Sequence, residues 1–453
     1  MKTMFKAICG LAVAAVIIGA TILGYMKFFE SELPEITLVP DAQTVTNKTR
    51  FILKAHDRDS GLEIVQVAVH QKGRQAIVLS QTFDTTQHSW SATFDLKSAK
   101  MQEGPFELLV SCTDKSLKHM GKGNTRLIKY DRVLDNHPPV VSVVSRQHNI
   151  SIGGCGMVVY TISEPVSTSG VMVGQRFFPG FKQQGTEYYL SLFSFPYDAD
   201  PQKDVPKVMA VDDAGNKGIS GIYYHLIPKR FRKDTIRITD GFLERKMPQF
   251  TTMFPNESDL LDVFLKVNNQ GRAQNRAQLH AFAQETTPSF VWNKAFLRQP
   301  GAANRATFGD QRTYIYKGKV IDHQRHLGVD LASVARDNVR AGNNGKVVFV
   351  GFMGIYGNVI IIDHGMGLQS LYAHLSQINV HKGDRITRGQ IIGRTGATGM
   401  AGGDHLHLGI ILAGLPVNPV EWWDSHWIRD NIESKLEIVR QAAQPAGTAE
   451  VTP

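Results

Sequence analysis

The sequence GNVIIIDHGMGLQSLYAHLS, residues 357–376, decides the fold class of the last third of the chain. Asn358 to Asp363 is a short apolar run, and Gln369 to Leu371 is strand-like. Residues 301–424 around this stretch hold 20 of the 41 glycines, although they make up less than a third of the 453 residues. Two more short runs lie on either side, at Lys346 to Val350 and Gln390 to Gly393. We therefore predict a compact antiparallel β domain with many tight turns and bulges.

Histidines are also concentrated in this region, which holds seven of the 16. His326 and Asp330 are four residues apart, and His405 and His407 lie two apart, so each pair shares one face of an extended strand. Either pair alone is more often incidental. Together they offer more than the three protein ligands of a catalytic zinc, which keeps one position open for water. His374 adds a further candidate just after the strand-like segment.

These segments resemble the catalytic domain of lysostaphin-type (LytM-like) zinc metallopeptidases, which cut peptide cross-links of peptidoglycan. The matching segments follow one another in the family's order across residues 299–426. They are His326-x-Gly328-x-Asp330, Gly357-Asn358-Val359-Ile360-x-x-x-His364, Leu371-Tyr372-Ala373-His374-Leu375-Ser376, Gly383-Asp384-x-Ile386-x-x-Gly389-Gln390-x-Ile392-Gly393, Gly396-x-Thr398-Gly399, His405-Leu406-His407 and Pro419.

The resemblance implies a role for five residues. His326, Asp330 and His407 would bind Zn²⁺. His374 and His405 would be catalytic: one takes a proton from water, and the other stabilises charge on the scissile carbonyl or protonates the leaving amine. The sequence leaves open which of the two histidines is the base.

Other residues in the domain receive different assignments. The resemblance favours a structural or supporting role for His364 rather than metal ligation. Asp404 and Gly409 stand where family members often have a proline and an acidic residue, and Asp404 is expected to orient a histidine or to tune the charge of the cleft. Three histidines are expected at the surface: His323, His381 and His426.

An uncharged run from Ala7 to Met26 follows Lys2 and Lys6. Its length matches the hydrocarbon thickness of a membrane, and the preceding lysines favour a cytoplasmic amino terminus. The alternative is a cleaved signal peptide, but the flank Leu23 to Lys27 lacks a small-x-small site. We therefore assign residues 1–30 as a cytoplasmic tip and single-pass anchor in the inner membrane. The catalytic domain is then expected in the periplasm or facing the cell wall.

The middle of the chain shows short alternating runs separated by turn residues, as in β-sandwiches. Pro138-Pro139 marks a boundary, because two prolines continue neither a sheet ladder nor a helix. We predict two immunoglobulin-like modules, at 35–136 and 137–228, which would hold the enzyme at the wall or contact another envelope protein. The runs that support this are Phe51 to Leu53, Ile64 to Val69, Phe106 to Val110, Val140 to Val144 and Val158 to Ile162.

Residues 229–298 form a predicted connector with a helix from Ser258 to Val267, capped by Ser258, and a second helix from Arg276 to Glu285. The connector either packs its apolar stripe on a neighbouring domain or covers the catalytic cleft and inhibits it. Residues 427–453 are predicted to form a helix and a disordered tail.

Three smaller features concern nucleic acid binding, disulfide bonds and calcium binding. The net charge of +9, without a dense basic block or an aromatic-basic motif, gives no reason to expect nucleic acid binding. Three cysteines exclude a disulfide-dense scaffold, and a Cys112–Cys155 bridge would have to join different modules. Asp57-x-Asp59-Ser60-Gly61 is interpreted as a solvated turn rather than a calcium loop, because the later acidic ligand is missing.

The sequence therefore predicts a mainly β protein: a transmembrane helix, two immunoglobulin-like β-sandwich modules, a short helical connector and an antiparallel β metallopeptidase domain. Its expected function is zinc-dependent endopeptidase cleavage of peptidoglycan cross-links in cell-wall remodelling. The alternatives are a weak or inactive wall-binding activator of another hydrolase, and an adhesin with immunoglobulin-like modules. Retention of all five site residues favours the enzyme, and an adhesin does not explain them.

Overall fold

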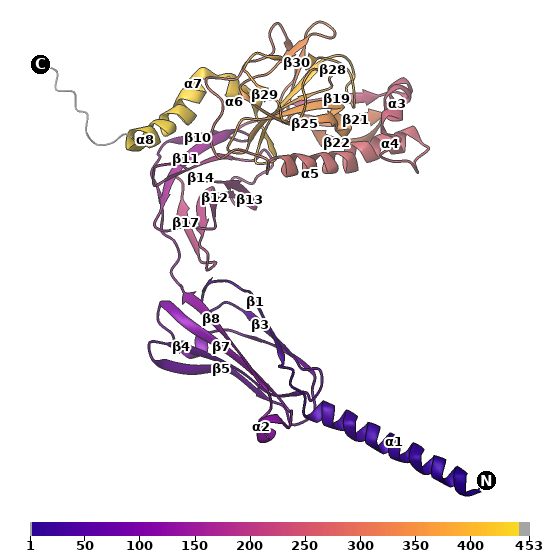
Figure 1. Ribbon diagram of the computed structural model, residues 1–453. Coiled ribbons are helices and arrows are strands. Elements are labelled where there is room, and N and C mark those ends of the chain that lie inside the picture. Colours follow the sequence, from indigo (N-terminus) through magenta and orange to yellow (C-terminus); the bar gives the residue numbers. More distant parts are fainter. Residues whose placement is uncertain (1, 444–453) are drawn as a thin grey trace, which may run out of the picture. The chain divides into compact units, whose positions relative to one another are not determined.

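The computed structural model describes residues 2–443 and is mainly β, as predicted (Figure 1). The chain divides into two compact units. The first comprises residues 1–138 with 211–217, and the second comprises 139–210 with 218–453. The predicted disordered tail falls on 444–453, which lie outside the described residues.

Helix α1, Lys2–Phe28, begins the first unit. Within it, Ile8–Met26 is long and apolar enough to cross a membrane, and none of this stretch is buried against the rest of the chain. The helix predicted from the uncharged run is thus present, and no part of the described chain buries its apolar stretch.

Two sheets form the rest of the first unit. Their orders are β2-β8-β7-β4-β5 and β1-β3-β6. Side chains of β3 and β7 alternate between buried and exposed, so each sheet turns one apolar face inward. The shared core includes Phe51 and Leu53 from one sheet and Val65 and Val110 from the other. This two-sheet arrangement is compatible with the first immunoglobulin-like module, which stays a prediction. The strands are β1 Glu35–Val39, β2 Thr44–Val45, β3 Phe51–His56, β4 Leu62–Gln71, β5 Arg74–Thr82, β6 Ser89–Phe94, β7 Gly104–Asp114 and β8 Thr125–Leu134.

The turn at Asp57 differs from its predicted form. Asp57 is 4% exposed, so the turn is not solvated at this side chain. Its Oδ2 accepts a hydrogen bond of 2.6 Å from the Gly61 amide, and Asp114 lies close by. Burial, followed by the charge of Asp114, raises the pKa of the Asp57 carboxyl.

The second unit begins with two four-stranded sheets, β14-β15-β11-β9 and β13-β12-β16-β17, and a parallel pair, β10-β18. Cys155 of this region is buried and unpaired, and so is Cys112 of the first unit, so the two form no disulfide. The strands are β9 Val141–Val143, β10 His148–Ser151, β11 Cys155–Ile162, β12 Thr168–Val173, β13 Arg176–Pro179, β14 Phe181–Lys182, β15 Tyr188–Ser194, β16 Lys207–Val211, β17 Lys217–Gly221 and β18 Tyr224–Ile227.

The connector contains a strand, β19 Lys233–Ile238, in addition to helices. The N-cap of its helix α4 is Asp259, whose carboxylate accepts from the Leu261 amide at 2.6 Å, so the prediction of Ser258 as the cap is wrong. The predicted second helix begins four residues earlier than expected, at Arg272, where a π-helical segment runs directly into it. The helices are α3 Asp240–Lys246, η2 Met247–Phe250, α4 Leu260–Lys266, η3 Val267–Gly271 and α5 Arg272–Phe282.

The last domain is built on an antiparallel sheet of eight strands with the order β20-β23-β31-β27-β26-β25-β29, to which β32 pairs at β31. This confirms the predicted antiparallel β class. Smaller sheets, β24-β30-β28 and β19-β21-β22, flank it. The strands are β20 Ala303–Ala306, β21 Gln311–Tyr316, β22 Lys319–Arg325, β23 Val329–Ala332, β24 Asn338–Arg340, β25 Gly345–Phe352, β26 Asn358–Asp363, β27 Leu368–Ala373, β28 Gln377–Ile378, β29 Arg385–Ile386, β30 Ile391–Arg394, β31 Leu406–Leu412 and β32 Leu415–Val417.

The carboxyl-terminal helices follow this sheet. Trp422 is fully buried in a core that also contains Phe193 of β15 and Ile410 of β31, so the helices, the preceding sheets and the last domain share one apolar interior. This shared core explains why residues 139–210 group with the last domain. The carboxyl-terminal helices are α6 Pro419–Trp423, α7 Ser425–Ile428, η5 Arg429–Glu433 and α8 Ser434–Ala443. One more short helix of this domain, η4 Gly354–Tyr356, lies between β25 and β26.

The connector packs its apolar side chains into the last domain. Phe264 and Val267 are fully buried in one core with Val359 of β26. Strand β19 also adds to the edge of the β21–β22 hairpin by parallel pairing. The connector is therefore part of the domain's own core, and its removal would expose that core to water.

Glu421 of α6 joins the last domain to β11. Its Oε2 accepts a hydrogen bond of 2.9 Å from the Cys155 amide. Burial raises the pKa of the Glu421 carboxyl to about 7. A raised pKa in the folded state means that the folded protein holds this proton more tightly than the unfolded chain does.

The Glu421 contribution to stability is therefore fully present below about pH 4.5 and is lost as the pH rises through about 7. We expect the unfolding temperature of this unit to fall between pH 5 and pH 8 by on the order of 5 °C more in the wild type than in Glu421→Gln. Tryptophan fluorescence during thermal unfolding measures this difference. Glu433→Gln, at an exposed position, is the matched control, and equal pH profiles for wild type and Glu421→Gln would contradict the assignment.

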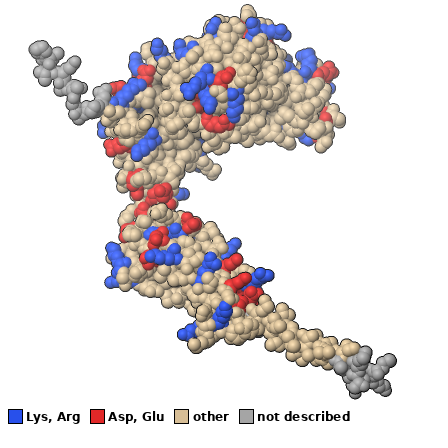
Figure 2. Space-filling view, viewed as in Figure 1, with Lys and Arg blue, Asp and Glu red and all other residues tan. Residues whose placement is uncertain are grey.

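Charged side chains of both signs are interspersed over the face of each unit shown in Figure 2. On that face the lysines and arginines form no single large patch.

Candidate metal centre

Strand register brings the distant site residues together. In the β23–β31 pairing Asp330 lies directly opposite His407, and in the β27–β31 pairing Ala373 lies opposite the same histidine. His374 therefore follows β27 at the same end of the sheet. His405 forms an isolated bridge with Gly396 just before β31. Asp330, His374 and the His405–His407 pair are far apart in the sequence, and the antiparallel pairing of three strands makes them neighbours.

Three side-chain atoms converge at the centre. Nε2 of His326 lies 2.9 Å from Oδ1 of Asp330 and 3.0 Å from Nδ1 of His407, and the last two atoms are 2.9 Å apart. All three residues are at most 9% exposed. Ligands of a tetrahedral zinc with bonds near 2.0 Å are separated by roughly 3.3 Å, so this triangle is close to the required size.

The hydrogen bonds around this triangle leave lone pairs at its centre. Nδ1 of His326 donates to the Thr307 carbonyl at 3.0 Å, because a carbonyl can only accept, and Nε2 of a neutral ring is then unprotonated. Arg312 donates to Oδ2 of Asp330 at 3.1 Å and leaves Oδ1 facing the histidines. Mutually facing lone pairs repel one another without a cation between them, so the donor set fits a metal ion with nitrogen and oxygen ligands.

His374 and His405 lie beside this triangle without belonging to it. Nδ1 of His374 donates to the Thr398 carbonyl at 2.9 Å, and Nδ1 of His405 donates to the Gly403 carbonyl at 2.9 Å. In the neutral rings Nε2 is then a proton acceptor. The two ring centroids are 4.8 Å apart, and Nε2 of His405 is 3.5 Å from Oδ1 of Asp330.

The backbone at His374 is unusual. Its φ is +64°, in the left-handed region that costs energy for a residue with a Cβ atom. Its amide donates to the Tyr356 carbonyl at 2.8 Å, which holds the residue in this conformation. The bend turns the chain at the end of β27, so that the ring faces His405.

Burial and mutual charge set the protonation of the site. Burial, helped by the neighbouring histidines, lowers the pKa of His374 well below its usual range, and burial lowers the pKa of His407 to about 4. Burial would raise the pKa of Asp330, but the neighbouring His326, His405 and His407 outweigh it and hold that pKa well below its usual range. Burial would also lower the pKa of His405, but the nearby Asp330 carboxylate favours the protonated ring, reverses the effect and raises that pKa.

A glycine allows the close approach of the strands at the site. A Cβ atom on Gly328 would lie 2.4 Å from Nε2 of His407 and 2.8 Å from the Leu408 carbonyl oxygen. The spacing His-x-Gly-x-Asp therefore has a steric reason, since any side chain at its middle position would push His407 away.

Other predicted residues lie elsewhere. His364 is fully buried away from the metal centre, between Ser370 and the Asn344 carbonyl, in keeping with a structural role. Asp404 accepts from the Arg336 amide at 3.1 Å and hydrogen-bonds to none of the described histidines, so its predicted role in orienting one is wrong. The three histidines expected at the surface are exposed: His323, His381 and His426.

Two residues that complete the surroundings of the site are not predicted by the sequence motifs. Arg312 pairs with Asp330, and Tyr356 lies with its ring centroid 5.4 Å from that of His407. Neither belongs to a short motif with the ligands, so no spacing signal was available to find them. The five predicted site residues line one cavity of about 220 Å³ with Phe242 and Phe264 of the connector. This cavity is the metal cleft.

An antiparallel β domain in which two histidines and an aspartate converge beside two more histidines can hold a metal ion next to groups that transfer protons. Residues 324–419 match the model of peptidase family M23. The chain therefore contains an M23 peptidase domain, as the resemblance to lysostaphin-type enzymes predicted.

Relatives share this region with the chain. DD-carboxypeptidase/endopeptidase Mpg of Neisseria meningitidis is 42% identical over 95 residues, which are 21% of this chain and 22% of that protein. Peptidoglycan DD-endopeptidase ShyA of Vibrio cholerae is 34% identical over 161 residues, 35% of this chain and 36% of that protein. The chain thus spans about a fifth to a third of the length of these relatives.

A solved structure also matches. The catalytic domain of lysostaphin from Staphylococcus simulans is 29% identical, and the match covers 27% of this chain and 92% of that domain with a TM-score of 0.24.

Proposed function

We propose that this protein is a zinc-dependent endopeptidase that hydrolyses peptide cross-links of peptidoglycan. The observation that carries the proposal is the convergence of His326, Asp330 and His407 within 3.0 Å of one another, beside two further histidines. The names of the M23 relatives, which include peptidoglycan DD-endopeptidases, support the substrate class.

In this proposal His326, Asp330 and His407 hold Zn²⁺. When bound, the ion supplies Lewis-acid chemistry: it polarises a carbonyl and makes water a stronger nucleophile. Arg312 fixes the Asp330 carboxylate, and the Thr307 carbonyl fixes the tautomer and the direction of the His326 ring.

His374 and His405 carry the proton transfers. The backbone carbonyls on their Nδ1 atoms leave each Nε2 ready to accept a proton from water or to return one to the leaving amine. The same hydrogen bonds prevent both rings from turning away from the cleft, so little reorganisation is needed during reaction.

The rest of the chain positions this chemistry. Helix α1 anchors the protein in the inner membrane as a single-pass helix, with the two compact units in the periplasm or facing the wall. The predicted immunoglobulin-like modules act as spacer and docking arms, where an envelope protein can bind. In the alternative function the protein has the same location but activates another wall hydrolase and does not itself cleave cross-links.

Metal removal tests the proposal. Purified full-length protein in detergent is incubated with peptidoglycan sacculi, and the released muropeptides are measured by chromatography and mass spectrometry. We expect release by the zinc-loaded protein, loss of release after chelation, and recovery on adding Zn²⁺. Absence of release by the zinc-loaded protein would favour the activator, and release that survives complete metal removal would contradict zinc dependence.

A further inference from the structure

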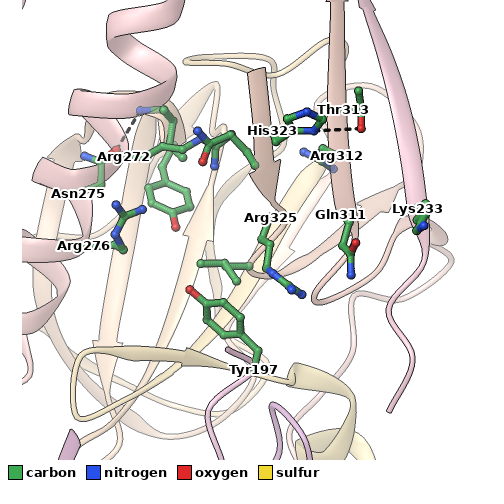
Figure 3. Close-up of a pocket in the computed structure, with 14 residues that line it drawn as sticks. Tyr197, Lys233, Arg272, Asn275, Arg276, Gln311, Arg312, Thr313, His323 and Arg325 are labelled. Atoms are coloured by element: carbon green, nitrogen blue, oxygen red, sulfur yellow. Dashed lines mark hydrogen bonds between the residues drawn. The ribbon is translucent and has the colours of Figure 1, made fainter. Parts of the chain in front are cut away.

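A second cleft, of about 630 Å³, adjoins the metal cleft (Figure 3). The two clefts share five lining residues: Arg272, Arg312, Leu327, Ile355 and Tyr356. Helix α5 forms one side, strands β19, β21 and β22 form the other, and Tyr197 lies between them. A peptide chain bound at the metal centre can therefore continue directly into this space.

The second cleft is strongly cationic. Its described lining includes no aspartate or glutamate and five positively charged side chains: Lys233, Arg272, Arg276, Arg312 and Arg325. We call it the basic cleft. Like charges gathered in one concave surface raise the local positive potential, because the protein around them screens less than water does.

Strand register explains part of this gathering. Lys233 pairs with Gln311, and Gln311 in turn pairs with Arg325, so the three side chains form one row across the sheet. In that row the cations Lys233 and Arg325 lie on either side of the neutral Gln311 side chain. Arg276 lies on the facing helix α5.

Most of these cations lack an acidic partner. Arg312 pairs with Asp330, and Arg272 donates to the Asn268 side chain at 2.8 Å. Among the described residues, the side chains of Lys233, Arg276 and Arg325 donate no hydrogen bond and form no ion pair. Arg325 instead lies over the rings of Tyr197 and Phe231, which fix its guanidinium without neutralising it.

We infer that the basic cleft is a binding subsite for free carboxylates of an acidic peptide, next to the bond that is cut. This inference rests on the proposed function for the identity of that peptide, a cross-linked stem peptide of the wall. The protein would then prefer cross-links whose side carboxyls are ionised over the same cross-links with carboxamides. The connector would then contribute to substrate binding, since three of the five cations belong to it: Lys233, Arg272 and Arg276.

Affinity rather than catalysis tests the inference. Two fluorescent cross-linked stem peptides of identical sequence, one with free carboxyls and one with carboxamides, are titrated with the metal-stripped full-length protein in detergent. At low salt we expect the carboxylate peptide to bind roughly 10-fold more tightly, with the difference shrinking towards 0.5 M salt. Equal affinities of the two peptides would overturn the inference.

Substitutions locate the binding site. Arg276→Gln and Lys233→Gln, at exposed positions, are each expected to weaken binding of the carboxylate peptide by about 2- to 5-fold. Arg325→Gln, held between aromatic rings, is expected to have the larger effect. Arg385→Gln is the control, since this exposed arginine lies on β29, at the far edge of the main sheet from β23. An equal loss in Arg385→Gln would show a diffuse charge effect and overturn the assignment.

These experiments distinguish failure of the proposed endopeptidase function from failure of the proposed carboxylate subsite. If the protein prefers the carboxylate peptide but releases no muropeptides, the proposed subsite is supported and the proposed endopeptidase activity is contradicted. If the protein hydrolyses both peptides with equal KM, the proposed endopeptidase activity is supported and the proposed subsite is overturned.

Discussion

His407→Ala is expected to remove zinc from the protein and to lower the rate of muropeptide release by roughly 10³-fold or more, because metal polarisation supplies several kcal/mol of transition-state stabilisation. Nδ1 of His407 is one of three converging atoms, and its loss leaves only two protein ligands, His326 and Asp330. Two ligands are one fewer than the three protein ligands of known catalytic zinc sites. Zinc content per chain, measured by atomic emission, and the rate of muropeptide release are the two measurements.

The control for His407→Ala is His323→Ala, which removes an exposed histidine of the same domain. This variant should keep both zinc and activity. A thermal unfolding curve of His407→Ala separates loss of a ligand from loss of the fold. A folded His407→Ala protein that retains one zinc per chain would contradict the assignment of this ligand.

Substitution of the two flanking histidines is expected to have the second largest effect. His374→Ala and His405→Ala should each lower kcat by about 10²- to 10⁴-fold, since general acid–base groups contribute that much. Zinc content should be unchanged, because neither ring belongs to the triangle of converging atoms. Steady-state kinetics on a soluble cross-linked peptide, combined with metal analysis, separates this result from loss of a ligand.

His381→Ala is the control for this pair, because its side chain is 92% exposed. The two catalytic variants are also informative against each other. If only one of them lowers kcat while the other raises KM alone, the second histidine binds substrate and does not transfer protons. Normal kcat in both variants would remove both histidines from the mechanism.

Much of the last domain follows from local sequence. Apolar runs separated by glycines predict short strands, and β26 coincides with the predicted run Asn358–Asp363. The spacing of His405 and His407 places both on one side of the strand, because side chains of an extended chain alternate. Both indeed approach Asp330. Such features depend on neighbours within a few residues, and the sequence carries that information directly.

The connector shows where local sequence was insufficient. Two of its helices, α4 and α5, were predicted, but α3 and β19 were not. A single edge strand such as β19 is specified by its partner β21 as much as by its own residues. Likewise, the choice of Asp259 over Ser258 as N-cap depends on where the helix begins. Local patterns place such boundaries only to within a few residues.

The sequence by itself determined which residues are the candidates for the site, because histidine and aspartate at fixed spacings, matched to a known family, predict the metal ligands. Only the tertiary structure decided what surrounds them. Arg312 beside Asp330, and the unpartnered cations Lys233, Arg276 and Arg325 in one cleft, come from separate elements that the connector and two sheets bring together. The physical reason is that spacing along a chain fixes neighbours on one strand, whereas contacts between elements depend on register and packing across the whole unit.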